Sequence, residues 1–324
     1  MYHNVLYDTH MNSVVSLSTA RVPALISSAG GRAAFRFVEF FTANIRNPNT
    51  RDSYRRAVRD FCQWCDTRGL KLDALHPVIV ASYIESLGQS YSKPSVKQHL
   101  AAIRMLFDYL VTGGVLPMNP ASSVRGPKYV IKRGRTPVLT AEEARTLLDS
   151  IETTTLIGLR DRALIGVMIY SFARVSAVVA LRADDYFQSG RRGKLRFMEK
   201  GGKYNEVFAH HNVEDYLDAY LKAAGGEGKG PLFRTSDRQD GLSEKPMHRT
   251  DVLRMVKRRA QAAGLPASTC NHSFRATGIT TYLKNGGRVE IAQQLAGHES
   301  ARTTGLYDRR DDDVSLDEIE RIAI

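Results

Sequence analysis

The chain has 324 residues, which is enough for two domains that each bury a core of their own. Three cysteines, an odd number in a chain this long, exclude a disulfide-stapled fold and fit a reducing compartment. A formal net charge of +12, with 25% charged residues, favours a polyanionic partner. We expect nucleic acid rather than a membrane surface, because no basic amphipathic anchor is evident.

No segment of the sequence is expected to enter a membrane. The longest apolar run, Ala163 to Ala173, is far shorter than the roughly 20 residues that a spanning helix needs. The first residues lack a basic leader followed by an apolar stretch, so a signal peptide is not expected. We therefore expect a bacterial cytoplasmic protein that is associated with the nucleoid.

The N-terminal part of the chain predicts a loose arm followed by a helical bundle. Residues 1–32 are rich in Ser, Ala and Gly and show no sustained period beyond one short helix. Apolar residues then recur at helical spacing and predict an amphipathic helix. Asn49 or Thr50 is its expected N-cap, and Gly69 lies just past its end. Helices are also expected over 77–87 and from Ser92 to Gly113. Residues 33–124 are therefore predicted to form a helical bundle.

Basic residues mark two candidate DNA-binding surfaces. Lys97 and Arg104 lie seven residues apart on the third helix, so they share a face that is either simply solvated or in contact with phosphates. The segment 125–139 is the predicted interdomain linker, and its first eleven residues hold five basic and no acidic ones. A solubilising connector is the alternative to a DNA contact. The linker's candidate contacts are Lys128, Lys132, Arg133 and Arg135.

Residues 140–324 predict a second domain that is mixed but mostly helical. Thr140 and Glu143 form a capping box that starts a helix over 140–151, and a buried helix follows over 156–171. Short strands at 194–198 and 206–208 flank a glycine-containing hairpin turn. Further helices are expected at 211–224, 248–263, 273–285, 288–296, 301–306 and 315–323. The fold class is therefore mainly α with a small antiparallel sheet.

Cofactor motifs are not found. Cys62 and Cys65 have the spacing of half a zinc site, but both lie on the apolar stripe of a helix, which favours core packing. No glycine-rich phosphate loop ends in Gly-Lys-Ser/Thr, and no GxGxxG turn follows a strand. We expect neither a metal nor an organic cofactor.

A cluster of cations and one phenol remains. His272 and Arg275 are three residues apart at the start of a helix, where free backbone N–H groups also favour an anion. Arg174 follows a buried helix and needs a partner. His298 comes directly after the glycine that ends another helix, and Tyr307 lies nine residues further on.

The order and spacing of these residues resemble those of the tyrosine recombinases, the phage-integrase family, over about residues 34–324. The resemblance implies a SAM-like core-binding domain in the N-terminal half and a catalytic domain after the linker. It also implies a set of catalytic residues, namely Arg174, Lys200, His272, Arg275, His298 and Tyr307.

The chemistry of phosphodiester cleavage agrees with this set. Without a metal, the non-bridging phosphate oxygens need cations, and the guanidinium groups of Arg174 and Arg275 bind phosphate bidentately. Tyr307 would be the nucleophile, since nearby cations favour a reactive phenolate. The departing 5′ oxygen needs a proton, for which Lys200 and Lys203 compete.

The family pattern places the catalytic lysine just before the glycine of the turn, which matches Lys200. Lys203 is then expected to contact the DNA backbone. His272 would assist proton transfer at the nucleophile, and His298 would hydrogen-bond the phosphate or the phenol.

Two further features of the sequence are the residue at position 177 and the C-terminal segment. Ala177 stands where the family usually carries an acid, so Asp184 or Asp185 is expected to substitute, or the site is assembled only on DNA. The segment 314–324 is acidic with an apolar stripe. By resemblance it is a helix that docks on a neighbouring subunit of a tetramer, and packing on its own domain is the alternative.

Three functions follow from these observations. The first is a site-specific recombinase that acts on double-stranded DNA with inverted repeats, through a 3′-phosphotyrosyl intermediate and a Holliday junction, for integration, excision or resolution, with or without accessory proteins. The second is a type IB-like topoisomerase. The third is a DNA-binding regulator without chemistry, which Ala177 favours.

Overall fold

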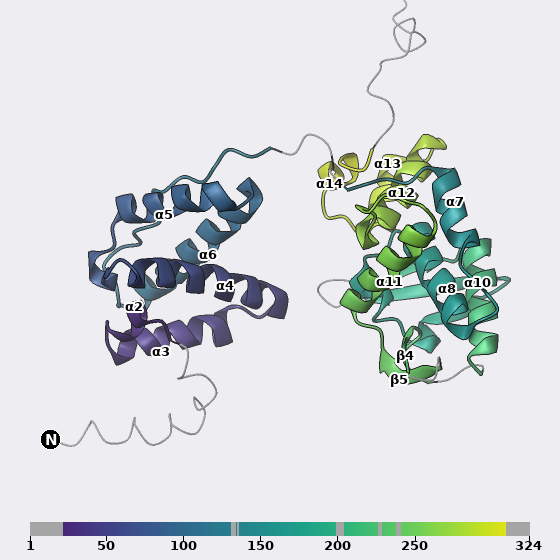
Figure 1. Cartoon of the computed structure of the whole chain (residues 1–324), viewed down its shortest axis with the longest axis horizontal. Helices are drawn as coiled ribbons and strands as arrows, with labels where there is room; N and C mark the ends of the chain where they lie inside the picture. Colours follow the sequence, from purple (N-terminus) through teal and green to yellow (C-terminus); the bar gives the residue numbers. More distant parts are fainter. Residues whose placement is uncertain are drawn as a thin grey trace, which may run out of the picture. The chain divides into compact units, whose positions relative to one another are not determined.

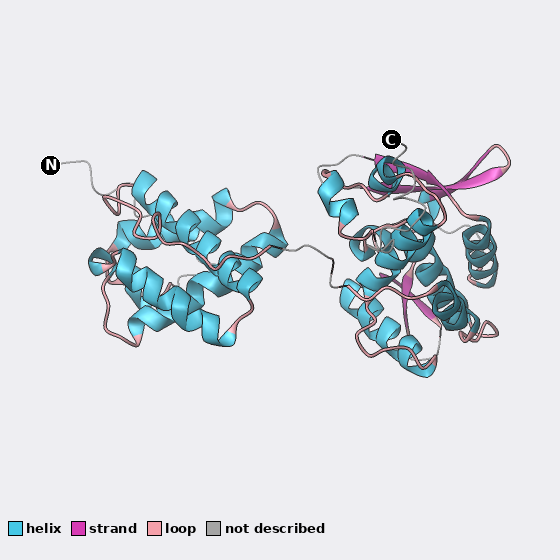
Figure 2. Ribbon diagram, turned by 90° about the horizontal axis from the view of Figure 1, so that it is seen from above, coloured by secondary structure: helices cyan, strands magenta, loops and turns pink. Residues whose placement is uncertain are grey.

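The structure is a computed structural model that describes residues 22–130, 134, 136–198, 204–225, 229–237 and 241–308. The chain divides into two compact units, residues 1–130 and 131–324. The boundary falls inside the segment predicted as the linker. The first unit is helical and the second combines helices with short strands (Figures 1 and 2).

The described part of the first unit consists of helices only. They are α2 (Ala24–Ser27), α3 (Gly31–Glu39), the π-helical turn η2 (Phe40–Asn44), α4 (Pro48–Asp66), the 3-10 turn η3 (Leu72–Ala74), α5 (Pro77–Ser90) and α6 (Lys93–Thr112). Asn47 caps α4, and its side chain accepts hydrogen bonds from the backbone N–H groups of Asn49 and Thr50. The predicted cap was therefore two or three residues too late, because Pro48 takes the first helical position.

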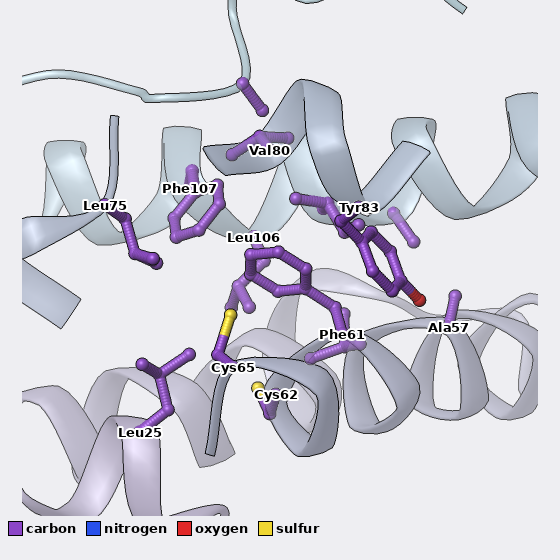
Figure 3. Packing of buried hydrophobic residues seen from close by; sticks show 14 of the residues in the cluster. Leu25, Ala57, Phe61, Cys62, Cys65, Leu75, Val80, Tyr83, Leu106 and Phe107 are labelled. Carbon is purple, nitrogen blue, oxygen red and sulfur yellow. The ribbon is translucent and has the colours of Figure 1, made fainter. Parts of the chain in front are cut away.

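The core of the first unit packs aromatic and aliphatic side chains from several helices, and Phe61, Tyr83 and Phe107 lie at its centre (Figure 3). Phe61 packs edge-on against Phe107 at 5.8 Å and against Tyr83 at 5.0 Å between ring centroids. Leu25 and Ile26 of α2 are also fully buried. The described end of the predicted loose arm therefore belongs to this core, and residues 1–21 of the arm lie outside the described residues.

The two cysteines of this unit are buried, which does not suit a metal site. Cys62 and Cys65 have no exposed surface, and loss of solvent raises the pKa of both thiols, to about 12 for Cys65. A thiol with so high a pKa stays protonated and binds metal poorly. Their position in the core agrees with the packing role predicted for them.

The described part of the second unit combines eight α-helices with a 3-10 turn and two antiparallel sheets. Its elements are α7 (Ala141–Asp149), α8 (Leu156–Tyr170), α9 (Val175–Val178), the 3-10 turn η4 (Ala183–Asp185), β1 (Tyr186–Ser189), β2 (Arg192–Met198), β3 (Tyr204–Phe208), α10 (His211–Ala223), β4 (Arg234–Ser236), β5 (Leu242–Pro246), α11 (Arg249–Ala262), α12 (Asn271–Lys284), α13 (Val289–Leu295) and α14 (Ala301–Gly305). The predicted capping box of α7 is present, with both Thr140 and Glu143 hydrogen bonds formed.

The sheets are small and lie at the edge of the helical core. One has the strand order β1-β2-β3, and β2 pairs with β3 from Lys194 opposite Phe208 to Met198 opposite Tyr204. The other, β4 with β5, was not predicted. A strand of three residues and a partner that ends in Pro246 show no alternation of apolar and polar residues, so the sequence pattern could not indicate them.

The buried helix α8 forms the centre of the second unit, with α10 and α12 packed against it. Its Asp161 is fully buried and pairs with three guanidinium groups, of which that of Arg258 is the most distant at 3.7 Å. One carboxylate oxygen accepts from Arg160 at 2.6 Å, and the other accepts from Arg259 of α11 at 2.8 Å. This ion cluster fixes α11 against α8.

Candidate active site

A cleft of about 880 Å³ opens in the second unit. Its ionisable lining residues come from segments far apart in the sequence, and they are Arg174, Arg275, His298 and Glu299. The first follows α8, the second belongs to α12, and the other two lie between α13 and α14. Three of the six predicted catalytic residues therefore line one cleft.

A strained turn after α8 presents Arg174. Phe172 has a φ of 56°, a left-handed conformation that a residue with a bulky side chain rarely adopts. Ser171 stabilises the turn, because its Oγ donates to Val167 O at 2.6 Å and accepts from Ala173 N at 3.2 Å. Arg174 is then the N-cap residue of α9 and is exposed. Its guanidinium forms no hydrogen bond or ion pair with any described residue.

Arg275 is held rigidly at the wall of the cleft. It is only 2% exposed, and its guanidinium donates to Phe172 O and, at 2.6 Å, to Ala296 O. The same side chain therefore ties the turn after α8 to the end of α13. Fixed donors of this kind suit a site that must stabilise charge as it develops, because they need no reorganisation during the reaction.

Gly278 makes this arrangement possible. A Cβ atom at this position would lie 2.0 Å from Ile169 O and 2.8 Å from Phe172 Cδ1. Only glycine lets α12 approach the end of α8 so closely, and Arg275 lies three residues earlier on the same face of α12. Sequence reasoning missed both Gly278 and Phe172, although the helical spacing of the Arg-x-x-Gly sequence could have pointed to the glycine.

His298 is a neutral imidazole at the back of the cleft. Gly297, with a φ of 56°, ends α13 and turns the chain inward. His298 is 7% exposed, and its Nδ1 shares a hydrogen bond of 2.9 Å with Thr304 Oγ1. Burial, followed by the positive charges of Arg275 and Arg174, lowers the pKa of His298 to about 4. The ring is therefore uncharged at neutral pH in the absence of DNA.

His272 lies at the first turn of α12 and is exposed. Partial desolvation, followed by the same two guanidinium groups of Arg275 and Arg174, lowers its pKa. Both arginines thus act electrostatically on both histidines. The four predicted cationic and imidazole groups that the structure describes therefore converge in space.

Tyr307 lies next to His298 but is not a lining residue of the cleft. The two rings are stacked, with centroids 5.5 Å apart and planes 13° apart. The phenol ring packs on a small apolar cluster that includes Phe172 and Ala296. Thr280 of α12 donates to the Tyr307 carbonyl oxygen at 2.7 Å. The backbone of the predicted nucleophile is thus anchored on the helix that carries Arg275.

The predicted lysines lie outside the described residues. Both Lys200 and Lys203 belong to the segment 199–203, which joins β2 to β3. The strand residues Met198 and Asn205 on either side of this segment line the cleft. The assignment of Lys200 as the proton donor stays a prediction.

The acid expected to replace the family residue at Ala177 is not found where the sequence placed it. Asp185 caps its own 3-10 turn by accepting from Arg182 N at 2.9 Å. Asp184 faces Arg182 across 3.5 Å at the surface. Neither aspartate lines the cleft, whereas Ala177 and Glu299 do.

The predicted DNA contacts in the first unit separate into two groups. Lys97 and Lys128 are exposed, and a Cβ on Gly126 would lie 3.5 Å from Lys97 Cγ, so the linker begins against this face of α6. Arg104 has another role. Its guanidinium donates to Ala121 O at 3.1 Å and to Val124 O, and so holds the segment after α6.

Two donors of Arg104 thus bond backbone carbonyl groups of its own unit, and its role as a phosphate contact stays a prediction. The other basic candidates, Lys132, Arg133 and Arg135, lie outside the described residues, as does the predicted docking segment 314–324.

Neither a membrane span nor a metal cluster is present in the described part of the chain. No helix there is both long and apolar enough to cross a membrane. No group of three or more His, Cys, Asp or Glu side chains in the described ranges is arranged to hold a metal ion.

Comparison with known proteins identifies the family. The model of the phage integrase family matches residues 137–313, and the model of the phage integrase N-terminal SAM-like domain matches residues 36–114. The chain is 28% identical over 261 residues to tyrosine recombinase XerD of Pseudomonas aeruginosa, with 80% of this chain and 86% of that protein covered. It is 30% identical over 284 residues to XerC of Pelobacter propionicus, with 85% and 88% covered.

The fold agrees with these matches. The structure of a lambda integrase tetramer bound to a Holliday junction gives a TM-score of 0.67 at 18% identity, over 88% of this chain and 78% of that one. At this identity the similarity shows the fold, mainly α with small antiparallel sheets. The family match over more than half of the chain and the similarity to XerC together show that the protein belongs to the phage integrase family of tyrosine recombinases.

Proposed function

We propose that the protein is a site-specific DNA recombinase in which Tyr307 attacks a backbone phosphate of the target DNA. The bond from phosphorus to the 5′ oxygen breaks, and a 3′-phosphotyrosyl bond forms in its place. The 5′ oxygen leaves as a hydroxyl group after it takes up a proton. The 5′ hydroxyl of a partner strand then reverses the step. The number of phosphoester bonds is conserved, so the exchange needs no ATP.

The convergence of cations beside the phenol carries this proposal. Burial, followed by the charges of Arg275 and Arg174, lowers the pKa of both His272 and His298, and His298 stacks on Tyr307. Two guanidinium groups at one cleft supply the charge that the non-bridging oxygens of a phosphate need in the transition state. A bound phosphate would in turn favour protonation of the neighbouring imidazoles, because it brings negative charge to them.

Proton transfer would involve three further groups. His272 is exposed at the start of α12 and would accept the proton of the attacking phenol. His298 would donate a hydrogen bond to the phosphate or to the phenol. Lys200, by resemblance to the family, would protonate the departing 5′ oxygen.

DNA binding would extend over both units. Lys97 and Lys128 are exposed where the linker begins against α6 of the first unit, and Lys132, Arg133, Arg135 and Lys203 are the further basic candidates. These residues would contact the phosphate backbone and would make the affinity fall steeply with salt.

Recombination would take place in a tetramer on two DNA sites, through a Holliday junction, by analogy with the lambda integrase tetramer bound to such a junction. The acidic segment 314–324 would dock on a neighbouring subunit. The substrate would be double-stranded DNA with inverted repeats, and the protein would act at the nucleoid in the bacterial cytoplasm. Integration, excision and resolution of a mobile element all use this chemistry.

The test begins with selection of bound DNA from a random pool, which supplies the target. A nicked duplex with this target, incubated with the protein in EDTA, should trap a covalent adduct, because loss of the short nicked strand prevents religation. Tyr307→Phe should form no adduct, and Tyr282→Phe, a phenol in the same apolar cluster, should form it normally. An adduct with Tyr307→Phe, or none with the wild-type chain, contradicts the proposal.

The same preparation separates the proposal from its alternatives. Relaxation of a supercoiled plasmid that lacks the selected site would favour a topoisomerase. Tight binding to the selected site without cleavage would favour a regulator. Neither alternative is favoured by the family matches.

A further inference from the structure

One carboxylate stands on the wall of the cationic cleft. Among the described lining residues, Glu299 is the only acidic one. It is exposed, and it forms no hydrogen bond or ion pair with another described residue. A carboxylate at this place repels the phosphate that the cleft is proposed to bind.

The backbone around Glu299 is fixed on both sides. Gln293 Nε2 donates to His298 O at 3.1 Å, and His298 N donates to Gln293 O at 3.0 Å. On the other side, Ser300 is the N-cap of α14, and its Oγ accepts from Arg302 N at 3.3 Å. The Glu299 side chain therefore leaves the backbone at a defined point beside the cleft.

The two guanidinium groups of the cleft differ in how they are held. Carbonyl oxygens of two segments fix Arg275, which is almost fully buried. Arg174 is exposed, and no described residue bonds its guanidinium. A free arginine side chain has many rotamers, so ordering it on a phosphate costs conformational entropy. Arg174 is thus the cation that a nearby carboxylate could usefully orient.

We propose that Glu299 is a positioning residue for Arg174, an inference that rests on the proposed function. With DNA in the cleft, the Glu299 carboxylate accepts hydrogen bonds from one edge of the Arg174 guanidinium. The other edge, which carries its own donors, then faces the phosphate. Glu299 thus weakens the attraction of the cleft for DNA and strengthens the stabilisation of the transition state.

Single-turnover cleavage of the nicked target tests this role. Glu299→Gln should slow adduct formation about 10- to 100-fold, the size expected when a hydrogen bond to a charged group is lost. The affinity for DNA should stay equal or rise, because a negative charge is removed. Glu290→Gln, at an exposed glutamate of α13, is the matched control and should cleave at the wild-type rate.

A double-mutant cycle with Arg174→Lys tests the pairing itself. An ammonium group cannot present two edges, so Glu299→Gln should slow the Arg174→Lys variant less than about threefold. A much smaller effect of Glu299→Gln in the Arg174→Lys background than in the wild-type background supports the proposal. Equal factors in both backgrounds would overturn it, as would a wild-type rate for Glu299→Gln or a parallel loss of rate and DNA affinity.

These outcomes are distinct from a failure of the proposed function. If the wild-type chain forms no adduct, the recombinase proposal fails and this inference fails with it. If the wild-type chain forms the adduct and Glu299→Gln matches its rate, only the role of Glu299 is overturned.

Discussion

Replacement of Arg275 by methionine should cost both activity and stability, and the structure sets the size of the second effect. The guanidinium donates to the carbonyl oxygens of Phe172 and Ala296, whose residues are 5% and 2% exposed. Methionine has similar length but no donor. Two buried acceptors would then lose their partners, at about 1–3 kcal/mol each, or about 2–6 kcal/mol in total.

Arg174→Met is the matched control. The Arg174 side chain is exposed and bonds no described residue, so its loss should change the free energy of unfolding by less than about 0.5 kcal/mol. Both variants should fail to form the covalent adduct. The two arginines would then be equally necessary for adduct formation, but only Arg275 would contribute to the stability of the fold.

Urea unfolding can assign the effect to the second unit. Trp64 is the only tryptophan and lies in the first unit, so its fluorescence reports on that unit alone. Arg275→Met should lower the midpoint followed by circular dichroism and leave the Trp64 transition in place. A wild-type circular dichroism midpoint for Arg275→Met would refute the account of how this guanidinium is held.

Three further predictions concern the same unit. The pKa of His298 is about 4 in the folded chain, against roughly 6.5 when unfolded, so the unfolded state binds more protons between these values. The free energy of unfolding should therefore fall by about 3 kcal/mol as the pH drops from 6.5 to 4. In urea titrations, His298→Asn should make the free energy of unfolding depend less on pH. An unchanged pH dependence in this variant would contradict the prediction. Asp161→Asn leaves the buried Arg160 guanidinium without its counter-ion and should destabilise the unit by about 3–5 kcal/mol, seen as a lower Tm; a loss below about 1 kcal/mol argues against the cluster. Gly278→Ala places a methyl group against Ile169 O and should cost at least about 1–3 kcal/mol and slow cleavage, whereas wild-type behaviour would show that α12 need not approach α8 so closely.

Local features of the fold could be predicted from the sequence where a short pattern decides the structure. The capping box of Thr140 and Glu143 starts α7 as expected, because both hydrogen bonds lie within four residues. The buried helix over 156–171 is found at Leu156–Tyr170. The packing of Leu25 and Ile26 could not be predicted, since it depends on a core that other helices complete.

The same contrast applies to the site. The order of the charged residues pointed to the cluster, and the structure brings Arg174, His272, Arg275 and His298 together. Arg104 has contacts that its spacing did not indicate. A spacing of seven residues places two side chains on one helix face, but it does not tell which later segment returns to cover that face. Here residues 121–124 return, and their carbonyl groups bind the guanidinium.

The central claim is that Tyr307 forms the covalent bond to DNA, and mapping the adduct tests it most directly. Trypsin cuts after Arg302 and Arg309, so the nucleophile would lie in the seven-residue peptide 303–309. The neighbouring phenol of Tyr282 falls in a separate peptide, 276–284. Mass spectrometry of the trapped and nuclease-trimmed complex should find the nucleotide on peptide 303–309. A nucleotide on peptide 276–284, or on any other peptide, would contradict the account.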